Sequence, residues 1–194
     1  MKILYIVYSL EVGGGVENIA NNFFSILNDN NIRCDFILLS NKIGSKKLDV
    51  EKRGSEVSKI DTFYENIIKG NYKLYKTLKH KRKLEYDAIH INLTCGSDIL
   101  LVLAAYLAGY RNIITHAHTN GGHKIAFYIV KFIAYLLTKK QLACSKEASN
   151  LYYFPAKKNV IIPNFFDIEK YSYNEKIREN IRMLYKLENK KVIG

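Results

Sequence analysis

The chain has 194 residues, of which 48% are apolar, and a formal net charge of +12 from 30 basic and 18 acidic side chains. This length and apolar content allow one sizeable hydrophobic core. Cys34, Cys95 and Cys144 lie far apart and form no CxxC pair, which argues against a disulfide framework or a structural zinc site and fits a reducing compartment. The positive charge favours nucleic acid, an anionic membrane surface or anionic small molecules as partners, without choosing among them.

The amino terminus, MKILYIVYSLEVGG, is interpreted as a buried first strand, because it carries no small-residue cleavage site of the kind that ends a signal peptide. The nearest approach to a membrane-spanning segment is the apolar run 125–138. It is shorter than the roughly 18 apolar residues that a spanning helix needs, and it contains Lys131.

Short apolar, β-branched runs alternate with longer amphipathic segments along the chain. The runs predict strands at 2–9, 33–40, 55–61, 87–93, 112–118, 141–145 and 159–163. Apolar residues at helical spacing predict helices at 16–29, 64–84, 97–109, 124–138, 146–153 and within 174–194. The lysine-rich stretch that follows 33–40 is interpreted as a polar loop.

Two of these helices carry more detailed expectations. In helix 16–29, the apolar face consists of Ile19, Phe23, Ile26 and Leu27. Helix 97–109 has Ser97 or Asp98 as its N-cap and Gly109 at its carboxyl end.

The order of these elements indicates the fold class. Strands that are continuously apolar imply a sheet buried on both faces, and their alternation with helices makes that sheet parallel. The predicted fold is therefore α/β, with an open, doubly wound, mainly parallel sheet of Rossmann-like type. In such sheets the functional loops lie at the carboxyl ends of the strands.

The stretch EVGGGVEN, residues 11–18, connects the first strand to the first helix. Backbone N–H groups and the positive end of the helix dipole meet there, which suits a phosphate, and glycines remove the Cβ atoms that would hold a ligand away. Val16, Glu17 and Asn18 break both the dinucleotide pattern GxGxxG and the P-loop pattern. The pattern alone leaves a phosphate-binding loop and a plain tight turn open.

Four motifs occur in a characteristic order: GGVEN after the first strand, HAHTN after a middle strand, then ACSKEASN, and VIIPNFFDIEKY near the end. Together they resemble the amino-terminal half of family 4 GT-B glycosyltransferases, the retaining nucleotide-sugar-dependent group, and most of all its capsule and exopolysaccharide enzymes. The resemblance extends from Lys2 to Gly194. It implies an acceptor-side Rossmann-like domain at 1–186, with 187–194 beginning the segment toward a second domain that would carry most of the donor site.

The resemblance also implies roles for individual residues. Gly14 and Gly15 approach the phosphates of the donor, and Asn120 belongs to the donor pocket that it shapes with Thr119. His118 contacts the transferred sugar or the charge that develops near it, as a catalytic residue. For His118 the residues themselves leave two other interpretations open: a hydrogen-bonded structural histidine, or a zinc ligand together with His116 and the loosely placed His123.

Six side chains are expected to line the cleft or the acceptor side: Glu17, His90, Asn92, Thr119, Ser145 and Asn164. Three have plainer explanations: Glu17 as a first-turn carboxylate favoured by the helix dipole, His90 as a buried structural group, and Ser145 as a helix N-cap. Beside Asn164, Phe165 stands where the family has glycine. A positive φ at this position would strain a phenylalanine.

Two segments raise the question of a membrane surface. Lys69, Lys73, Lys76 and Lys83 fall at helical spacing within 67–86, with Ile67, Leu74 and Leu78 on another face. These lysines form either a solvated face or a site for anionic lipid headgroups. The segment 125–138 is either a helix covering the sheet or an interfacial one. The resemblance favours a cytoplasmic protein that associates peripherally with the inner face of the membrane.

The resulting hypothesis is half of a retaining glycosyltransferase. It would bind a nucleotide-sugar donor and a glycan or lipid-linked acceptor, require no metal or other cofactor, and be inactive without its second domain. A dinucleotide-dependent oxidoreductase is the first alternative, but it needs the GxGxxG loop and an acidic residue where Ser40 and Asn41 stand. A nucleic-acid-binding module is the second; it needs a basic-aromatic surface, whereas Tyr5 and Tyr8 fall in a core strand, so no nucleic acid partner is expected.

Overall fold

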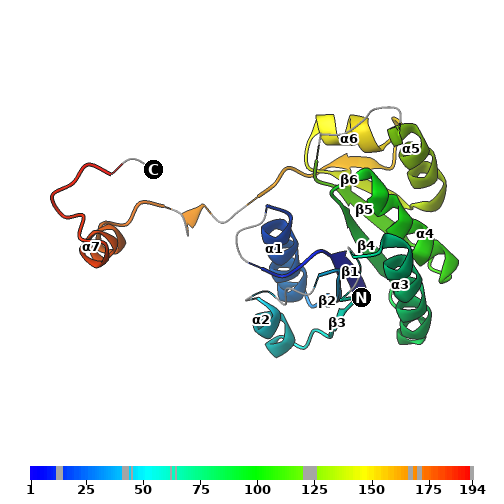
Figure 1. Ribbon diagram of the computed structural model, residues 1–194, viewed down its shortest axis with the longest axis horizontal. Coiled ribbons are helices and arrows are strands. Elements are labelled where there is room, and N and C mark those ends of the chain that lie inside the picture. The colour runs from blue at the N-terminus through cyan, green and yellow to red at the C-terminus, as the bar shows by residue number, and fades with distance from the viewer. Residues whose placement is uncertain are drawn as a thin grey trace. The chain divides into compact units, whose positions relative to one another are not determined.

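The structure is a computed structural model, and it describes residues 1–11, 15–40, 44, 46–61, 63, 65–119, 126–165, 168–169 and 172–192 (Figure 1). The chain divides into two compact units, Met1–Asn164 and Phe165–Gly194. The first unit contains the sheet and six of the α-helices described below. In the second unit, helix α7 (Glu175–Leu184) begins at Asn174, whose side chain accepts from the backbone N–H of Ile177 at 3.1 Å, and none of its residues is buried within the unit.

The first unit is built on one sheet of seven parallel strands in the order β3-β2-β1-β4-β5-β6-β7. The strands are β1 (Lys2–Val7), β2 (Arg33–Leu38), β3 (Val57–Lys59), β4 (Ala88–Leu93), β5 (Ile113–Ala117), β6 (Lys140–Ala143) and β7 (Asn159–Ile161). The strand order reverses between β1 and β4, which makes their carboxyl ends the switch point where α/β sheets bind ligands. The predicted doubly wound, parallel α/β fold is confirmed.

Helices cover both faces of this sheet. They are α1 (Gly15–Asp29), α2 (Lys47–Lys52), α3 (Ile67–Lys81), α4 (Ile99–Leu107), α5 (Ala126–Leu137) and α6 (Lys146–Tyr152), with short 3₁₀ turns at η1 (Arg82–Leu84) and η2 (Gly96–Asp98). Figure 1 shows α1 and α2 on one side of the sheet and α3, α4 and α5 on the other. Two core clusters correspond to these two sides, one including Phe24 and Val50 and the other including Leu74, Val102 and Phe127.

One local expectation is wrong, and another is confirmed only in part. The lysine-rich stretch after β2 contains helix α2, which Val50 anchors in the core although its neighbours are charged. In α1 the predicted face packs on the core through the buried Ile19 and the partly buried Phe23 and Leu27, but Ile26 is half exposed, and Ala20 and Phe24 are buried as well. Helical spacing identifies a stripe of apolar residues, but the centre of the buried stripe depends on how the helix sits over the sheet.

Asp98 is the N-cap residue of α4, as predicted, but its side chain makes no capping hydrogen bond to this helix. The carboxylate of Asp98 instead reaches back to the turn before η2. It accepts from the backbone N–H groups of Thr94 at 2.6 Å and Cys95 at 3.0 Å, and from the Thr94 hydroxyl at 2.9 Å. Asp98 therefore fixes the loop at the carboxyl end of β4. Gly109 ends this segment as predicted, with a φ of +97° that favours glycine.

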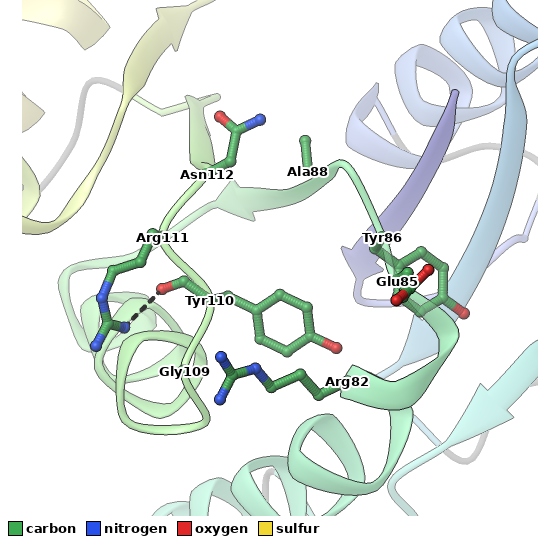
Figure 2. Close-up of a pocket in the computed structure, with 8 residues that line it drawn as sticks. All are labelled: Arg82, Glu85, Tyr86, Ala88, Gly109, Tyr110, Arg111 and Asn112. Atoms are coloured by element: carbon green, nitrogen blue, oxygen red, sulfur yellow. Dashed lines mark hydrogen bonds between the residues drawn. The ribbon is translucent and has the colours of Figure 1, made fainter.

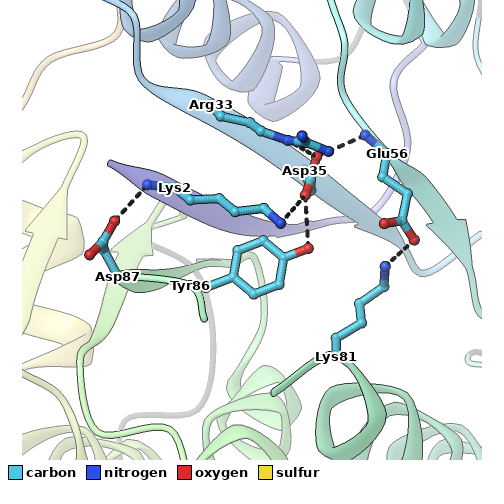
Figure 3. A network of polar contacts seen from close by, with 7 residues as sticks. All are labelled: Lys2, Arg33, Asp35, Glu56, Lys81, Tyr86 and Asp87. Atoms are coloured by element: carbon cyan, nitrogen blue, oxygen red, sulfur yellow. Dashed lines mark hydrogen bonds and ion pairs between the residues drawn. The ribbon is translucent and has the colours of Figure 1, made fainter. Parts of the chain in front are cut away.

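The amino-terminal edge of the sheet is held by a buried carboxylate, that of Asp35 in β2 (Figure 3). It accepts hydrogen bonds from the Glu56 N–H and the Tyr86 hydroxyl, both at 2.8 Å. Lys2 and Arg33 pair with it at 3.4 and 3.3 Å. Burial alone would raise the pKa of Asp35, but these hydrogen bonds and positive charges outweigh it and hold the pKa below its usual value. One side chain thus ties together residues from β1, β2 and the segments that enter β3 and β4.

Candidate functional site

Three histidines stack at the carboxyl end of the sheet, two on adjacent strands and one just beyond. His90 lies in β4, His116 lies in β5 beside Asn92 of β4, and His118 follows β5 directly. The ring centroids of His90 and His116 are 5.6 Å apart, and those of His116 and His118 are 4.1 Å apart. We call these three residues the histidine column. His116 and His118 share one face, as the HxH spacing predicts.

Aromatic side chains enclose the column. Tyr5 of β1 stacks on His90 with a centroid distance of 4.5 Å, and Phe23 of α1 meets the rings of His90 and His116 edge-on at 6.0 and 5.7 Å. His116 has no exposed surface, and His90 has only 4%. The column therefore lies in a largely apolar layer between the sheet and α1.

Burial in this layer disfavours the charged form of each imidazole. It lowers the pKa of His118 to about 4, that of His90 to about 3 and that of His116 to about 2. The nearby His118 ring depresses the pKa of His90 and His116 further. All three rings are consequently neutral near pH 7.

His118 is oriented by Asn92. Its Nε2 lies 2.7 Å from Asn92 Oδ1, and Asn92 Nδ2 in turn donates to the backbone carbonyl of Ile6 at 3.4 Å. Because the amide nitrogen is directed to Ile6, the amide oxygen faces the histidine, and an amide oxygen only accepts. His118 therefore carries its proton on Nε2. Its Nδ1, the acceptor of this tautomer, is buried and has no hydrogen-bond partner among the described residues.

The loop from β1 into α1 contributes a second group of polar atoms. Glu17 lies in the first turn of α1, where it accepts a hydrogen bond from the Ser9 hydroxyl at 3.4 Å. Gly15 is the first residue of α1, is exposed, and has nothing within 4 Å of the position that a Cβ would occupy. Its φ is not in the left-handed region, so glycine leaves open space here and is not required by the backbone conformation. Gly14 lies outside the described residues.

The other predicted residues fall in different places. Ser145 follows β6 and caps α6, accepting from the Ala148 N–H at 3.1 Å, which agrees with its interpretation as an N-cap. Thr119 is half buried directly after His118, and Asn120 lies outside the described residues. Asn164 is exposed at the end of the first unit. Phe165 does not have a positive φ, so the expected strain is not present.

The structure thus brings together His90, Asn92 and His118, and places Glu17 and Gly15 at the start of the helix that covers them. Sequence reasoning missed the central position of His116 and the contribution of Phe23. The signal was present as two short patterns, HIN in one strand and HAH in the next. Only the strand register shows that they are neighbours.

Two cavities lie away from this site. One, of about 220 Å³, opens at the amino ends of β4 and β5, between Arg82, Tyr110 and Arg111 (Figure 2). The other is an apolar groove of about 440 Å³ between α3 and α4, where Tyr72, Tyr75 and Leu107 are among the lining side chains. Because the first cavity is at the opposite edge of the sheet from the histidine column, it is not part of the predicted cleft.

The part of the chain that the structure describes contains neither a metal site nor a membrane-spanning helix. No three histidine, cysteine or acidic side chains there are grouped so that they could hold a metal ion. His123, the third residue of the zinc interpretation, falls outside that part. Nor does any helix in the described ranges have the length and apolar character needed to cross a membrane.

Comparison with known proteins gives matches at the level of structure alone. No protein-family model matches the chain, and no curated protein sequence matches it. HepE from Anabaena, solved in complex with UDP, is similar over 97% of this chain and 51% of its own, with 20% identity and a TM-score of 0.64. A glycosyltransferase from Rickettsia africae is similar over 97% and 50%, with 16% identity and a TM-score of 0.68.

Structures of another kind of enzyme share the same architecture. The UDP-GlcNAc 2-epimerase from Neisseria meningitidis, bound to UDP-GlcNAc, is similar over 95% of this chain and 53% of its own, with 12% identity and a TM-score of 0.62. The chain spans about half the length of each of these proteins. It therefore has the fold of one Rossmann-like half of the GT-B architecture, in which glycosyltransferases and UDP-sugar epimerases are built.

Proposed function

We propose that this chain is the acceptor-side domain of a retaining family 4 glycosyltransferase in surface polysaccharide synthesis. It would form one wall of a cleft that binds a nucleotide-sugar donor and a glycan or lipid-linked acceptor, with the domain at 1–186 and the link to a second domain at 187–194. The reaction would need no metal or other cofactor. The observation that carries this proposal is the neutral His118, oriented by Asn92 at the carboxyl ends of β4 and β5, in the histidine column that α1 covers through Phe23.

The chemistry follows from the positions of these groups. Backbone N–H groups in the first turn of α1, unobstructed at Gly15, suit a donor phosphate. The half-buried His118 would lie beside the transferred sugar, and its neutral ring adds no positive charge beside an oxocarbenium-like transition state. Gly14, Asn120 and Thr119 would complete the donor side. Glu17, Ser145 and Asn164 would line the acceptor side, whereas the buried His90 would support His118 through His116.

Nucleotide-sugar binding is tested by titrating the ¹⁵N-labelled chain with UDP-GlcNAc. We expect backbone NMR shifts to change around Gly15, Glu17 and His118, at the carboxyl edge of the sheet. NAD⁺ and duplex DNA serve as probes for the two alternative functions. Shift changes confined to the cavity at Arg82 and Arg111, or stronger changes with NAD⁺ or DNA than with UDP-GlcNAc, would contradict the proposal.

Substitution of Asn92 tests how His118 is held. In Asn92→Leu the buried Nε2–H of His118 loses its acceptor, which is expected to cost about 1–3 kcal/mol of stability and to release the fixed tautomer. Long-range ¹H–¹⁵N correlation spectra should show the Nε2–H form in the wild type and a mixture in Asn92→Leu. Asn92→Asp keeps an acceptor oxygen and should keep the Nε2–H form. An unchanged tautomer in Asn92→Leu would show that Asn92 does not orient the ring.

The chain by itself is expected to be inactive, because the residues that would stabilise the leaving phosphate belong to the second domain. Incubation with UDP-GlcNAc and with glycan acceptors should release no UDP above the rate without protein. The same reaction mixture tests the second candidate function, 2-epimerisation of the nucleotide-sugar. This candidate is considered because the chain is similar in structure to the Neisseria 2-epimerase. Clear UDP release with sugar transfer would refute the predicted inactivity, and an epimerised nucleotide-sugar would replace transfer as the function.

We further propose that the protein is cytoplasmic and associates peripherally with an anionic membrane surface, where a lipid-linked acceptor would be found. The lysines Lys69, Lys73, Lys76 and Lys83 are exposed on α3 and η1, opposite the buried Leu74 and Leu78. This arrangement supports attraction to anionic headgroups but is equally suited to a solvated face.

A further inference from the structure

Helix α5 is apolar on both of its sides. Phe127, Val130 and Ala134 are buried against the core. The opposite side carries five large side chains that are between 49% and 67% exposed: Tyr128, Ile129, Phe132, Tyr135 and Leu136. We call these five residues the outer stripe. A helix that is apolar all round is normally buried all round, and a contiguous apolar surface of this kind marks an interaction site.

Lysines surround the outer stripe. The Nζ atom of Lys131 lies 5.6 Å from the Tyr128 ring centroid, and that of Lys158 lies 4.7 Å from the Tyr135 ring centroid. Lys139 and Lys140 are exposed just beyond the end of α5. Residues 124–158 contain seven lysines and a single acidic residue, Glu147. The apolar surface therefore has a rim that is almost uniformly positive.

We propose that the outer stripe of α5 is the surface by which this chain binds an anionic lipid bilayer. Its aromatic and aliphatic side chains enter the boundary between headgroups and acyl chains, and Lys131, Lys139 and Lys140 face the headgroup phosphates. The Lys158 ammonium donates to the backbone carbonyls of Tyr135 and Thr138 and so holds the end of α5. Aromatic and aliphatic residues on one side, with lysines whose stems extend along apolar surface, are the composition of interfacial helices. The proposal specifies the surface for the membrane association proposed above and rests on that proposal.

The positive rim is the reason to choose a bilayer over a second copy of the chain. In a symmetric dimer the same patch meets itself, so Lys131, Lys139 and Lys140 would approach the lysines of the partner. Like charges placed opposite one another in an interface are unfavourable. An anionic bilayer offers phosphates to the lysines and an apolar interior to the stripe at the same time.

The layer to which α5 belongs supports this choice. Helices α3, α4 and α5 pack on the same side of the sheet, with α4 in contact with both of the others (Figure 1). The exposed lysines of α3 and the apolar groove between α3 and α4 are thus part of the same layer as the outer stripe. A bilayer could contact this layer across several helices, whereas α1 and α2 cover the other face of the sheet.

Co-sedimentation of the chain with vesicles tests the proposal. The chain should bind vesicles of phosphatidylcholine mixed with phosphatidylglycerol, and bind pure phosphatidylcholine vesicles far more weakly. The double variant Ile129→Asn, Phe132→Asn should bind the mixed vesicles more weakly by on the order of tenfold or more. Lys131→Gln with Lys139→Gln should weaken binding by about fivefold for each lysine and reduce its salt dependence.

The matched control is Leu48→Asn in α2, which replaces a side chain that is 66% exposed on the other side of the sheet. It should bind mixed vesicles as the wild type does, and circular dichroism should show that every variant is folded. Equal binding by the wild type and the Ile129→Asn, Phe132→Asn variant would overturn the proposal. So would a concentration-dependent dimer in light scattering that this variant abolishes, without vesicle binding, because the stripe would then belong to a second copy.

The vesicle result is independent of the nucleotide-sugar titration. If the chain binds mixed vesicles through α5 but UDP-GlcNAc causes no shift changes, the glycosyltransferase proposal fails and the membrane surface stands. If UDP-GlcNAc binds and the vesicles do not, only the membrane surface fails.

Discussion

Replacing Asp35 with alanine is expected to lower the free energy of unfolding by about 3–5 kcal/mol, the range for removing one partner of a buried ion pair. The buried carboxylate accepts hydrogen bonds from Glu56 and Tyr86 and pairs with Lys2 and Arg33. Without it, the partly buried donors of Glu56 and Tyr86 and the partly buried charge of Lys2 lose their partner. Urea unfolding at neutral pH, followed by circular dichroism, measures the loss.

Two further variants separate the charge of Asp35 from its geometry. Asp35→Asn keeps an oxygen that can accept from Tyr86 or Glu56, so its loss should be intermediate. Asp49→Ala is the surface control, because the Asp49 side chain is exposed and pairs only across one turn with Lys46 at 3.4 Å. Its effect should stay within about 0.5 kcal/mol. If Asp35→Ala were as mild as Asp49→Ala, the network in Figure 3 would not hold the edge of the sheet.

The second large effect is a loss of stability in weak acid, caused by the histidine column. A histidine in the unfolded chain titrates near pH 6.5, whereas the pKa is about 3 for His90 and about 2 for His116 in the folded chain. Between these values the unfolded state binds more protons than the folded state. The stability is therefore complete above about pH 6.5 and falls as the pH decreases toward the folded-state values.

The size of this effect follows from the linkage relation. Between pH 7.5 and pH 5.5, each of the two buried histidines should lower the free energy of unfolding by about 1.4 kcal/mol, or by about 3 kcal/mol together. His118, with a pKa lowered to about 4, acts in the same direction. Urea unfolding at a series of pH values between 5.5 and 7.5 measures how steeply the free energy of unfolding depends on pH.

His116→Phe identifies the source of this slope. Neither ring nitrogen of His116 has a hydrogen-bond partner among the described residues, and its neighbours in the layer include Phe23 and the His118 ring. The His116→Phe variant should therefore be about as stable as the wild type at pH 7.5. Between pH 7.5 and pH 5.5 its free energy of unfolding should fall by about 1.4 kcal/mol less than that of the wild type. His80→Phe, on the exposed side of α3, should leave the slope unchanged. Equal slopes in the wild type and His116→Phe would contradict the assignment.

Regular local patterns were read correctly from the sequence. The run in β1 is apolar from Ile3 onward, and β4 and β5 are mostly apolar and almost entirely buried, because the parallel sheet is covered on both faces. Gly109 was placed at a helix end because a positive φ selects glycine locally. Helix α2 was missed because a single buried residue, Val50, anchors it among charged neighbours.

The candidate site was predicted only in part. His118, His90 and Asn92 were identified as separate residues near strand ends. Their mutual contacts were not, because His118 and Asn92 are 26 residues apart and meet only through the pairing of β4 with β5. Asp35 gave no signal in the sequence, since its partners come from three other segments.

The sequence by itself determined the alternation of strands and helices, and with it a parallel α/β sheet whose carboxyl edge carries the polar residues. These features depend on periodicity and on short-range backbone preferences, which each segment carries alone. The tertiary structure decided which histidines lie against one another, which ring nitrogen of His118 carries the proton, and which side of the mostly apolar helix α5 remains exposed. Burial and hydrogen bonding at these places depend on what the neighbouring segments supply, and neighbours in space are set by strand order and register.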